Sequence, residues 1–106
     1  MYARRVSMKL KPNSATAFTT SLEKEVIPML RKQKGFRDEM TFVSPGGADA
    51  LAISMWDQKE NAEEYGHGAY PGALQTLKWV VEGTPRVQSY EVSNSTLHKI
   101  AVAPAA

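Results

Sequence analysis

The 106-residue chain contains no cysteine. Disulfide bonds, thiolate metal sites and cysteine nucleophiles are therefore excluded. Histidine is also scarce: His67 and His98 are the only two, and no set of histidine and carboxylate residues has the spacing typical of metal ligands. We therefore expect no bound metal. The lack of cysteine fits a reducing compartment, and we expect a cytoplasmic location.

Long apolar runs and strong charge are missing as well. No stretch approaches the ~20 apolar residues needed to cross a membrane, and the N-terminus lacks an apolar signal segment. Thirteen basic and eleven acidic residues leave a net charge of +2. Arg4 and Arg5 are the only adjacent arginines, and they suit a solvated strand edge. Neither a membrane nor a nucleic acid is expected as a partner.

With 42% hydrophobic and 23% charged residues, the chain has the composition of a globular protein. Its length predicts one domain over residues 1–106. Residues 93–106 follow no clear period, so we expect this tail to be loosely structured or to contact a partner chain. Within it, residues 96–102 could add a short strand, residues 103–106 should be loose, and His98 is expected to be solvated or at the partner chain.

Period-two alternation of apolar residues predicts four strands, over residues 2–10, 36–44, 49–56 and 86–92. A helical pattern covers residues 15–34, in which Pro28 should distort the helix without ending it, and Gly35 should end it. Strand–helix–strand therefore occurs twice. The order βαββαβ predicts an α+β, ferredoxin-like fold with an antiparallel sheet.

The second helical region follows the third strand and is interrupted. Asp57 is expected to cap it, because its carboxylate can accept from free N–H groups of the first turn. Gly66, Gly68 and Pro71 then break the helix, and a second helical run follows. Residues 82–85 are expected to form the turn into the last strand.

Both faces of the predicted sheet carry apolar residues. Met40 and Phe42, for example, lie opposite Val43. A sheet with one solvated face should alternate more cleanly between apolar and polar residues. We therefore expect an identical sheet from a second chain to cover the outer face, which makes the protein a homodimer.

Four segments carry a resemblance to a known family: SLEKEVIPMLRKQKGF, the strand–helix junction AISMWDQKENAEEY, the pair Tyr70–Pro71, and VQSYEV near the end. Over about residues 4–90 the chain resembles the antibiotic biosynthesis monooxygenase domain family of dimeric α/β barrels. In its quinone-forming members, the resemblance implies a reaction without metal or flavin. A polycyclic phenol binds between the sheet and the helices, loses its proton, and reacts as an anion with O₂.

The resemblance implies a site between the sheet and the broken helix, with an aromatic slot, a proton acceptor and a polar anchor for an oxyanion. His67 is the candidate catalytic base and is expected at the mouth of the cavity, because it is the only side chain nearby that titrates near neutral pH. An arginine, Tyr70 or Asn61 could anchor an oxygen. The candidate substrate-binding residues are Trp56, Tyr65, Tyr70, Phe42 and Asn61.

The sequence does not fit the pattern of the haem-degrading members of the family. They carry an Asn on the first strand that is absent here, and their helix Trp and His positions fall on Tyr65 and Gln75. Two hypotheses stay open. One is a cofactor-independent monooxygenase acting on a small aromatic or quinol-like substrate. The other is a non-catalytic dimeric barrel that binds a small apolar ligand or has a structural or regulatory role. In that second case, Trp56 anchors the core and His67 is an exposed loop residue.

Overall fold

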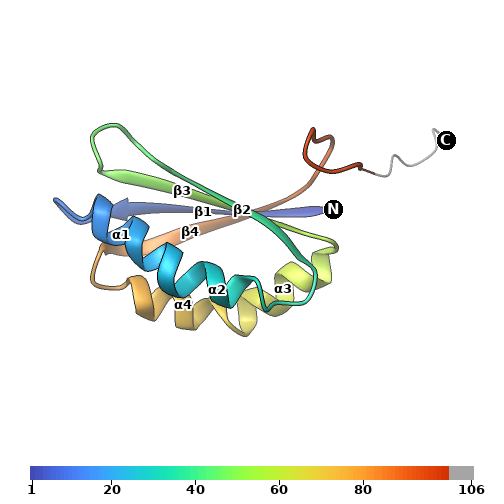
Figure 1. The fold of residues 1–106 in the computed structure, drawn as a ribbon, viewed down its shortest axis with the longest axis horizontal. Coiled ribbons are helices and arrows are strands. Elements are labelled where there is room, and N and C mark those ends of the chain that lie inside the picture. Colours follow the sequence, from blue (N-terminus) through green and yellow to red (C-terminus); the bar gives the residue numbers. More distant parts are fainter. Residues whose placement is uncertain (101–106) are drawn as a thin grey trace.

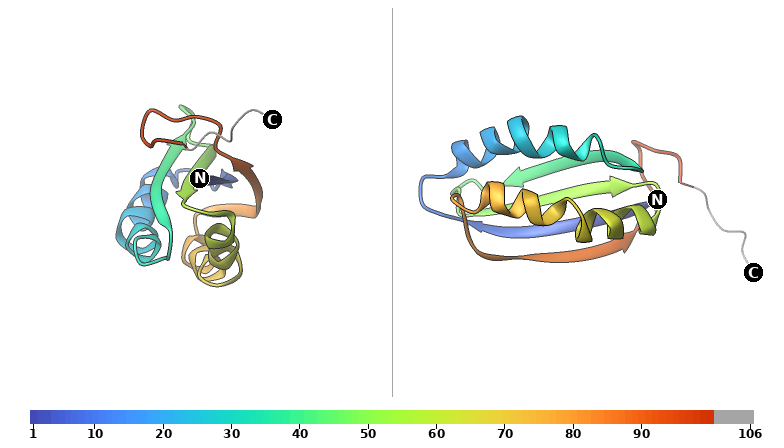
Figure 2. Two further views of the ribbon diagram at one scale, coloured as in Figure 1. Left: turned by 90° about the vertical axis from the view of Figure 1, so that its right-hand side faces the viewer. Right: turned by 90° about the horizontal axis from the view of Figure 1, so that it is seen from below.

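The computed structural model describes residues 1–100 of the chain. Four strands form one antiparallel sheet in the order β2-β3-β1-β4. All helical segments lie on the same face of this sheet, so the molecule has two layers (Figures 1 and 2). The α+β, ferredoxin-like prediction is confirmed. The elements, in chain order, are β1 (Tyr2–Leu10), α1 (Ala15–Ser21), η1 (Leu22–Val26), α2 (Ile27–Leu30), β2 (Phe36–Val43), β3 (Asp49–Trp56), α3 (Lys59–His67), α4 (Tyr70–Leu77) and β4 (Val81–Glu91).

The hydrophobic core lies between the two layers. Every second residue of β1, from Val6 through Met8 to Leu10, is buried against the helices. Phe18 from α1 and Trp56 from the end of β3 are fully buried. Burial of one such large apolar side chain contributes ~1.5–3 kcal/mol, so the helix-facing rows of the sheet hold the layers together.

The first helical region is distorted next to Pro28. Proline has no backbone N–H, and the turn before it, η1, is a π-helix in which Ile27 N–H donates to the carbonyl of Leu22. The predicted distortion without a break is confirmed. The predicted end is wrong: the helix stops at Leu30, and turns follow. Gly35 has the expected positive φ of 78°, but it ends these turns rather than the helix.

The start of α3 corrects the predicted cap. Asp57 N–H still donates to the carbonyl of Gly35, so this residue belongs to the end of the sheet and the helix begins later. Gln58 is the N-cap, and it forms a capping box with Asn61, whose Oδ1 accepts from Gln58 N–H at 3.1 Å. The Asp57 carboxylate instead pairs with Arg37. The predicted break is confirmed, since α3 ends at His67 and α4 begins at Tyr70.

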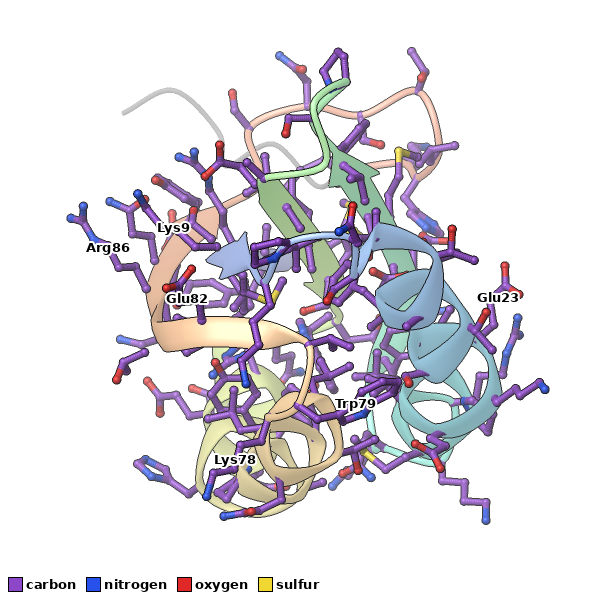
Figure 3. The ribbon with its side chains drawn as sticks, turned by 90° about the vertical axis from the view of Figure 1, so that its left-hand side faces the viewer. Lys9, Glu23, Lys78, Trp79, Glu82 and Arg86 are labelled. Atoms are coloured by element: carbon purple, nitrogen blue, oxygen red, sulfur yellow. The ribbon has the colours of Figure 1, made fainter. Side chains whose placement is uncertain are left out.

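The last strand is longer than predicted. The expected turn over residues 82–85 lies within β4, which runs from Val81 to Glu91. The pairing of β4 with β1 shifts register between Ser7 and Lys9, and Gly83 has a φ of 71°. A bulge at this edge strand therefore accommodates Gly83 and Pro85 where a turn was expected. The side chains of Lys9 and Arg86 project from this end of the molecule (Figure 3).

The face of the sheet away from the helices remains open among the described residues. Met40, Phe42 and Tyr90 on this face are each about half exposed. Residues 93–100 form no strand, and the ring of His98 contacts the Asp38 carboxylate of its own chain instead of being simply solvated. The rest of the predicted short strand and residues 103–106 lie outside the described residues. No helix in the described range is long and apolar enough to span a membrane.

Substitution of Gly35 by alanine is expected to destabilise the fold more than the same change at Gly83. Both glycines have positive φ, which costs alanine ~1–2 kcal/mol. A Cβ at Gly35 would also lie 2.2 Å from Asn61 Oδ1, whereas nothing lies within 4 Å at Gly83. In urea denaturation, the free energy of unfolding should therefore fall by ~1–3 kcal/mol more in Gly35→Ala than in Gly83→Ala. Equal losses would contradict the close packing of Gly35 on Asn61.

Candidate functional site

A small cavity lies between the sheet and the helices and has a volume of about 50 Å³. Aliphatic side chains of η1, α2 and the sheet form most of its wall. The polar groups on the wall are Arg4, Glu39, Ser54, Tyr65 and Tyr70. This volume is about a third of the ~150 Å³ of an engineered cavity that binds benzene. An aromatic ligand therefore enters only if the cavity widens.

Four aromatic rings form a continuous row beside the cavity. Trp56 stacks on Tyr65 with ring centroids 5.0 Å apart and an interplanar angle of 27°. Phe36 meets the edge of Trp56 at 5.5 Å, and Tyr65 meets Tyr70 at 5.9 Å. The row links the end of β3 with α3 and α4. It fixes Tyr65, because the fully buried indole behind that ring leaves it little freedom to move.

Arg4 ends this aromatic row and carries a buried positive charge. Its side chain is 6% exposed, and its guanidinium carbon lies 3.9 Å from the ring centroid of Tyr70 and 5.3 Å from that of Tyr65. Among residues 1–100, no carboxylate forms an ion pair with it. Contact with aromatic faces offsets ~2 kcal/mol or more of the desolvation cost. A buried charge without a counter-ion costs several kcal/mol, so Arg4 creates a place where an anion would be stabilised.

The last turn of α3 passes close to this charge at Gly66. A Cβ at Gly66 would lie 3.7 Å from an Arg4 Nη atom and 3.8 Å from its Nε, which is ordinary van der Waals contact. The guanidinium therefore sits directly under the last turn of α3, between the tyrosine rings and the sheet. This position places the cation beside the cavity, where it would interact with an anion that enters.

Burial raises the pKa of the other ionisable groups on the wall. Burial raises the pKa of Tyr65 to about 12, with the charge of Arg4 acting in the opposite direction. Burial also raises the pKa of Tyr70, and Arg4 again opposes the change. Burial raises the pKa of Glu39, while a hydrogen bond from Thr41 opposes it. At neutral pH the tyrosines are therefore neutral, so neither of them supplies a negative charge to Arg4.

The structure separates the predicted site residues. Tyr65 and Tyr70 lie on the cavity wall, between the sheet and the broken helix, where the site was expected. Trp56 lies behind Tyr65 in the core, and its Nε1 donates to Ser54 Oγ at 2.9 Å. Asn61 is buried in the capping box of α3. Phe42 is on the opposite face of the sheet, because it pairs with Leu51 in the outward-facing row.

His67 lies outside the cavity, which corrects its expected position at the mouth. It is exposed and lines a shallow surface depression with Glu60, Glu63 and Glu64. Helix geometry explains this, because residues two apart point in directions ~200° apart, and Tyr65 points inward. The geometry therefore gives no support to His67 as the base for a ligand in the cavity.

Three polar groups of the cavity were not singled out as site residues from the sequence: Arg4, Glu39 and Ser54. A signal for Arg4 was present, because it continues the inward-facing row of Val6, Met8 and Leu10 by one step. Its charge favoured a solvated position, and the row was read as starting at Val6. Within the described part of the chain, no group of three or more His, Cys, Asp or Glu side chains is arranged to hold a metal.

Comparisons with known proteins identify structures that have the same fold. No protein-family model matches the sequence, and no curated protein sequence matches it either. Solved structures do match. A protein of unknown function from Nitrosomonas europaea is 15% identical with a TM-score of 0.75, and the match covers 92% of this chain and 94% of that one.

Two similar structures are oxygenases from Streptomyces. The monooxygenase of the ActVA-Orf6 gene of Streptomyces coelicolor, solved with the ligand nanaomycin D, is 14% identical with a TM-score of 0.70 and covers 92% of both chains. SnoaB, a cofactor-independent oxygenase of Streptomyces nogalater, is 9% identical with a TM-score of 0.73; 92% of this chain and 97% of that one are covered. The chain therefore has the fold of the antibiotic biosynthesis monooxygenases, and the resemblance seen in the sequence is confirmed at that level.

The buried phenol of Tyr65 should make the free energy of unfolding depend on pH in alkali. Its pKa in the folded state is about 12, against 10.0 for an ordinary tyrosine. Its contribution to the free energy of unfolding is therefore complete below about pH 10 and is lost as the pH rises through 12, ~2–3 kcal/mol in all. In denaturant titrations across this pH range, the free energy of unfolding should fall less in Tyr65→Phe than in the wild type. An identical loss in the variant would contradict the buried, neutral phenol.

Proposed function

We propose that this protein is a cofactor-independent monooxygenase of the antibiotic biosynthesis type, acting on a small aromatic or quinol-like substrate. The observation that carries this proposal is the buried Arg4, which has no carboxylate ion-pair partner among residues 1–100 and lies on the wall of a cavity lined mainly by aliphatic side chains. An ionised phenol has the matching chemistry, with one anionic oxygen for the guanidinium and an apolar ring for the remaining wall.

The reaction supported by this arrangement begins with an ionised phenol. Arg4 stabilises the phenolate and so lowers the cost of removing the proton, as donors of an oxyanion hole do. The electron-rich ring then reacts with O₂. Oxidation of a naphthol to a naphthoquinone balances with one O₂, because one oxygen atom enters the ring and the other leaves as water. The substrate supplies all the electrons, so the proposed reaction calls for neither metal nor flavin.

A second function is favoured by the size of the cavity. At about 50 Å³ it is smaller than an aromatic ring requires, and no histidine lines it. A non-catalytic barrel that binds a small anion with an apolar body would show the same Arg4 environment. The two functions differ in O₂ consumption, since a binding protein holds the ligand without oxidising it.

The assembly proposed for either function is a homodimer joined through the outer faces of the sheets. Met40 is 51% exposed and Phe42 is 48% exposed on that face, beside the half-buried Leu51 and Ile53. In the same face, Arg5 has a buried Nε without a hydrogen-bond partner in the described residues. A second sheet would cover the apolar side chains and could supply an acceptor to Arg5.

Removal of the Arg4 charge should abolish oxygen uptake. A panel of naphthols and naphthoquinols, with 1-methoxynaphthalene as the compound that cannot ionise, would be followed with an oxygen electrode. Arg4→Met keeps length and apolar packing but removes the cation, so kcat/KM should fall at least ~100-fold, while Arg4→Lys should retain an intermediate rate. Circular dichroism checks that both variants fold. Unchanged turnover in Arg4→Met, or no uptake by the wild type with any panel member, would count against the monooxygenase.

The dimer should depend on the outer face and not on other exposed apolar residues. Sedimentation at micromolar concentration is expected to show a dimer for the wild type. Met40→Glu places a charge in the proposed interface and should shift the protein to monomer, because burial of an unpaired charge is costly. Trp79→Glu is the matched control, since Trp79 is 59% exposed but lies just after α4, at the end of the molecule seen in Figure 3. A monomeric wild type would refute the dimer.

A further inference from the structure

The cavity contains a second ionisable side chain opposite Arg4, and it comes from the edge strand β2. Glu39 pairs with Ser54, and Ser54 pairs with Arg4, so the three residues form one row across β2, β3 and β1. All three line the cavity. Neighbouring strands lie ~4.8 Å apart, so the backbones of Glu39 and Arg4 are ~10 Å apart. A carboxyl group and a guanidinium thus approach the same space from two sides.

We propose that Glu39 is the proton acceptor of this site and takes the phenolic proton of a ligand whose oxygen faces Arg4. This inference rests on the proposed function, because it assigns the base that an ionised phenol requires. It replaces His67, which lies outside the cavity. A base must come within hydrogen-bond reach of the proton that it removes. Among residues 1–100, Glu39 is the one carboxylate on the cavity wall.

The surroundings of Glu39 suit a base more than a permanent counter-ion. Burial raises its pKa, and a base works best when its pKa is close to the working pH. The hydroxyl of Thr41 on the same strand donates a hydrogen bond to Glu39 Oε1. From the other elements, the charged or titratable groups on the cavity wall are Arg4 of β1, Tyr65 of α3 and Tyr70 of α4; η1 and α2 contribute aliphatic side chains.

The proton transfer leaves the net charge of the cavity unchanged. The O–H bond of the phenol breaks, its electron pair stays on the oxygen, and the proton binds to a carboxylate oxygen of Glu39. The negative charge therefore moves from Glu39 to the ligand, where Arg4 is its direct partner. Because no new charge appears in the low-dielectric interior, the step avoids the desolvation cost that proton release to water would leave behind.

The proposal is tested by counting protons when a phenol binds. The probe is 4-nitrophenol, because its phenol and phenolate forms absorb at different wavelengths. Calorimetric titrations in two buffers of different ionisation enthalpy, at several pH values from about 5 to 8, give the number of protons released per bound probe. The wild type is expected to bind the phenolate at a pH where most of the free probe is protonated, and to release close to zero protons, since Glu39 retains them.

Glu39→Gln keeps the shape and the hydrogen-bond acceptor for Thr41 but cannot take a proton. It is expected either to release one proton per bound phenolate or to bind the neutral phenol, as its absorbance will show. One control should behave like the wild type: Glu60→Gln, which changes an exposed carboxylate on α3.

The outcomes separate this assignment from the proposed function. One proton released per phenolate by the wild type itself would overturn the role of Glu39, whether or not the Gln variant folds, and would leave phenolate binding at Arg4 intact. The same proton count together with the same phenolate absorbance in wild type and Glu39→Gln would overturn it as well. No binding of 4-nitrophenol up to its solubility limit would overturn both. Binding with retained protons but without O₂ uptake would support Glu39 as the acceptor and reject the monooxygenase.

Discussion

The burial of one arginine is the constraint on which the rest of the site depends. A guanidinium is always charged in a protein, so a side chain that is 6% exposed needs strong compensation. In this chain the compensation comes from aromatic faces, because the cation lies over Tyr70 and within reach of Tyr65. The tyrosine faces offset only part of the desolvation cost of the guanidinium. An anionic ligand that pairs with Arg4 would offset more of this cost, and this favours its binding.

The break between α3 and α4 follows from the same constraint. In an unbroken helix, two residues five positions apart point in directions ~140° apart, so Tyr65 and Tyr70 could not both meet one guanidinium. The chain interrupts the helix at Gly68, whose backbone lies outside the regular helical region, and α4 then presents Tyr70 to Arg4. Gly66, two residues earlier, lies in the last turn of α3 beside the cation. The break at Gly68 thus lets two helical pieces share one charge.

The sequence predicted the parts of the structure that repeat a simple period. The bounds of β1 and β3 and the two faces of each strand follow from alternation, and the distortion at Pro28 follows from its missing N–H. The structure departs from the prediction where tertiary contacts determine the bounds of an element. The backbone of Asp57 stays bonded to Gly35, so the cap moves to Gln58, and a bulge carries β4 through a segment that looks like a turn. Arg4 and Glu39 were not predicted as site residues. The alternation along their strands places them on the inner face of the sheet, but charged side chains are more often exposed to solvent.

Trp56 shows how a residue can act on the site without contact with the cavity. It is fully buried, its Nε1 is bonded to Ser54, and its indole stacks on the back of Tyr65. Ser54 and Tyr65 are both cavity residues, so one side chain fixes a polar group on the sheet and an aromatic group on the helix. The half-buried Tyr70 has no indole behind it, and its ring instead contacts Tyr65 and the guanidinium of Arg4. The cavity wall is therefore anchored to the core on the Trp56 side, whereas on the Tyr70 side it depends on the contact with Arg4.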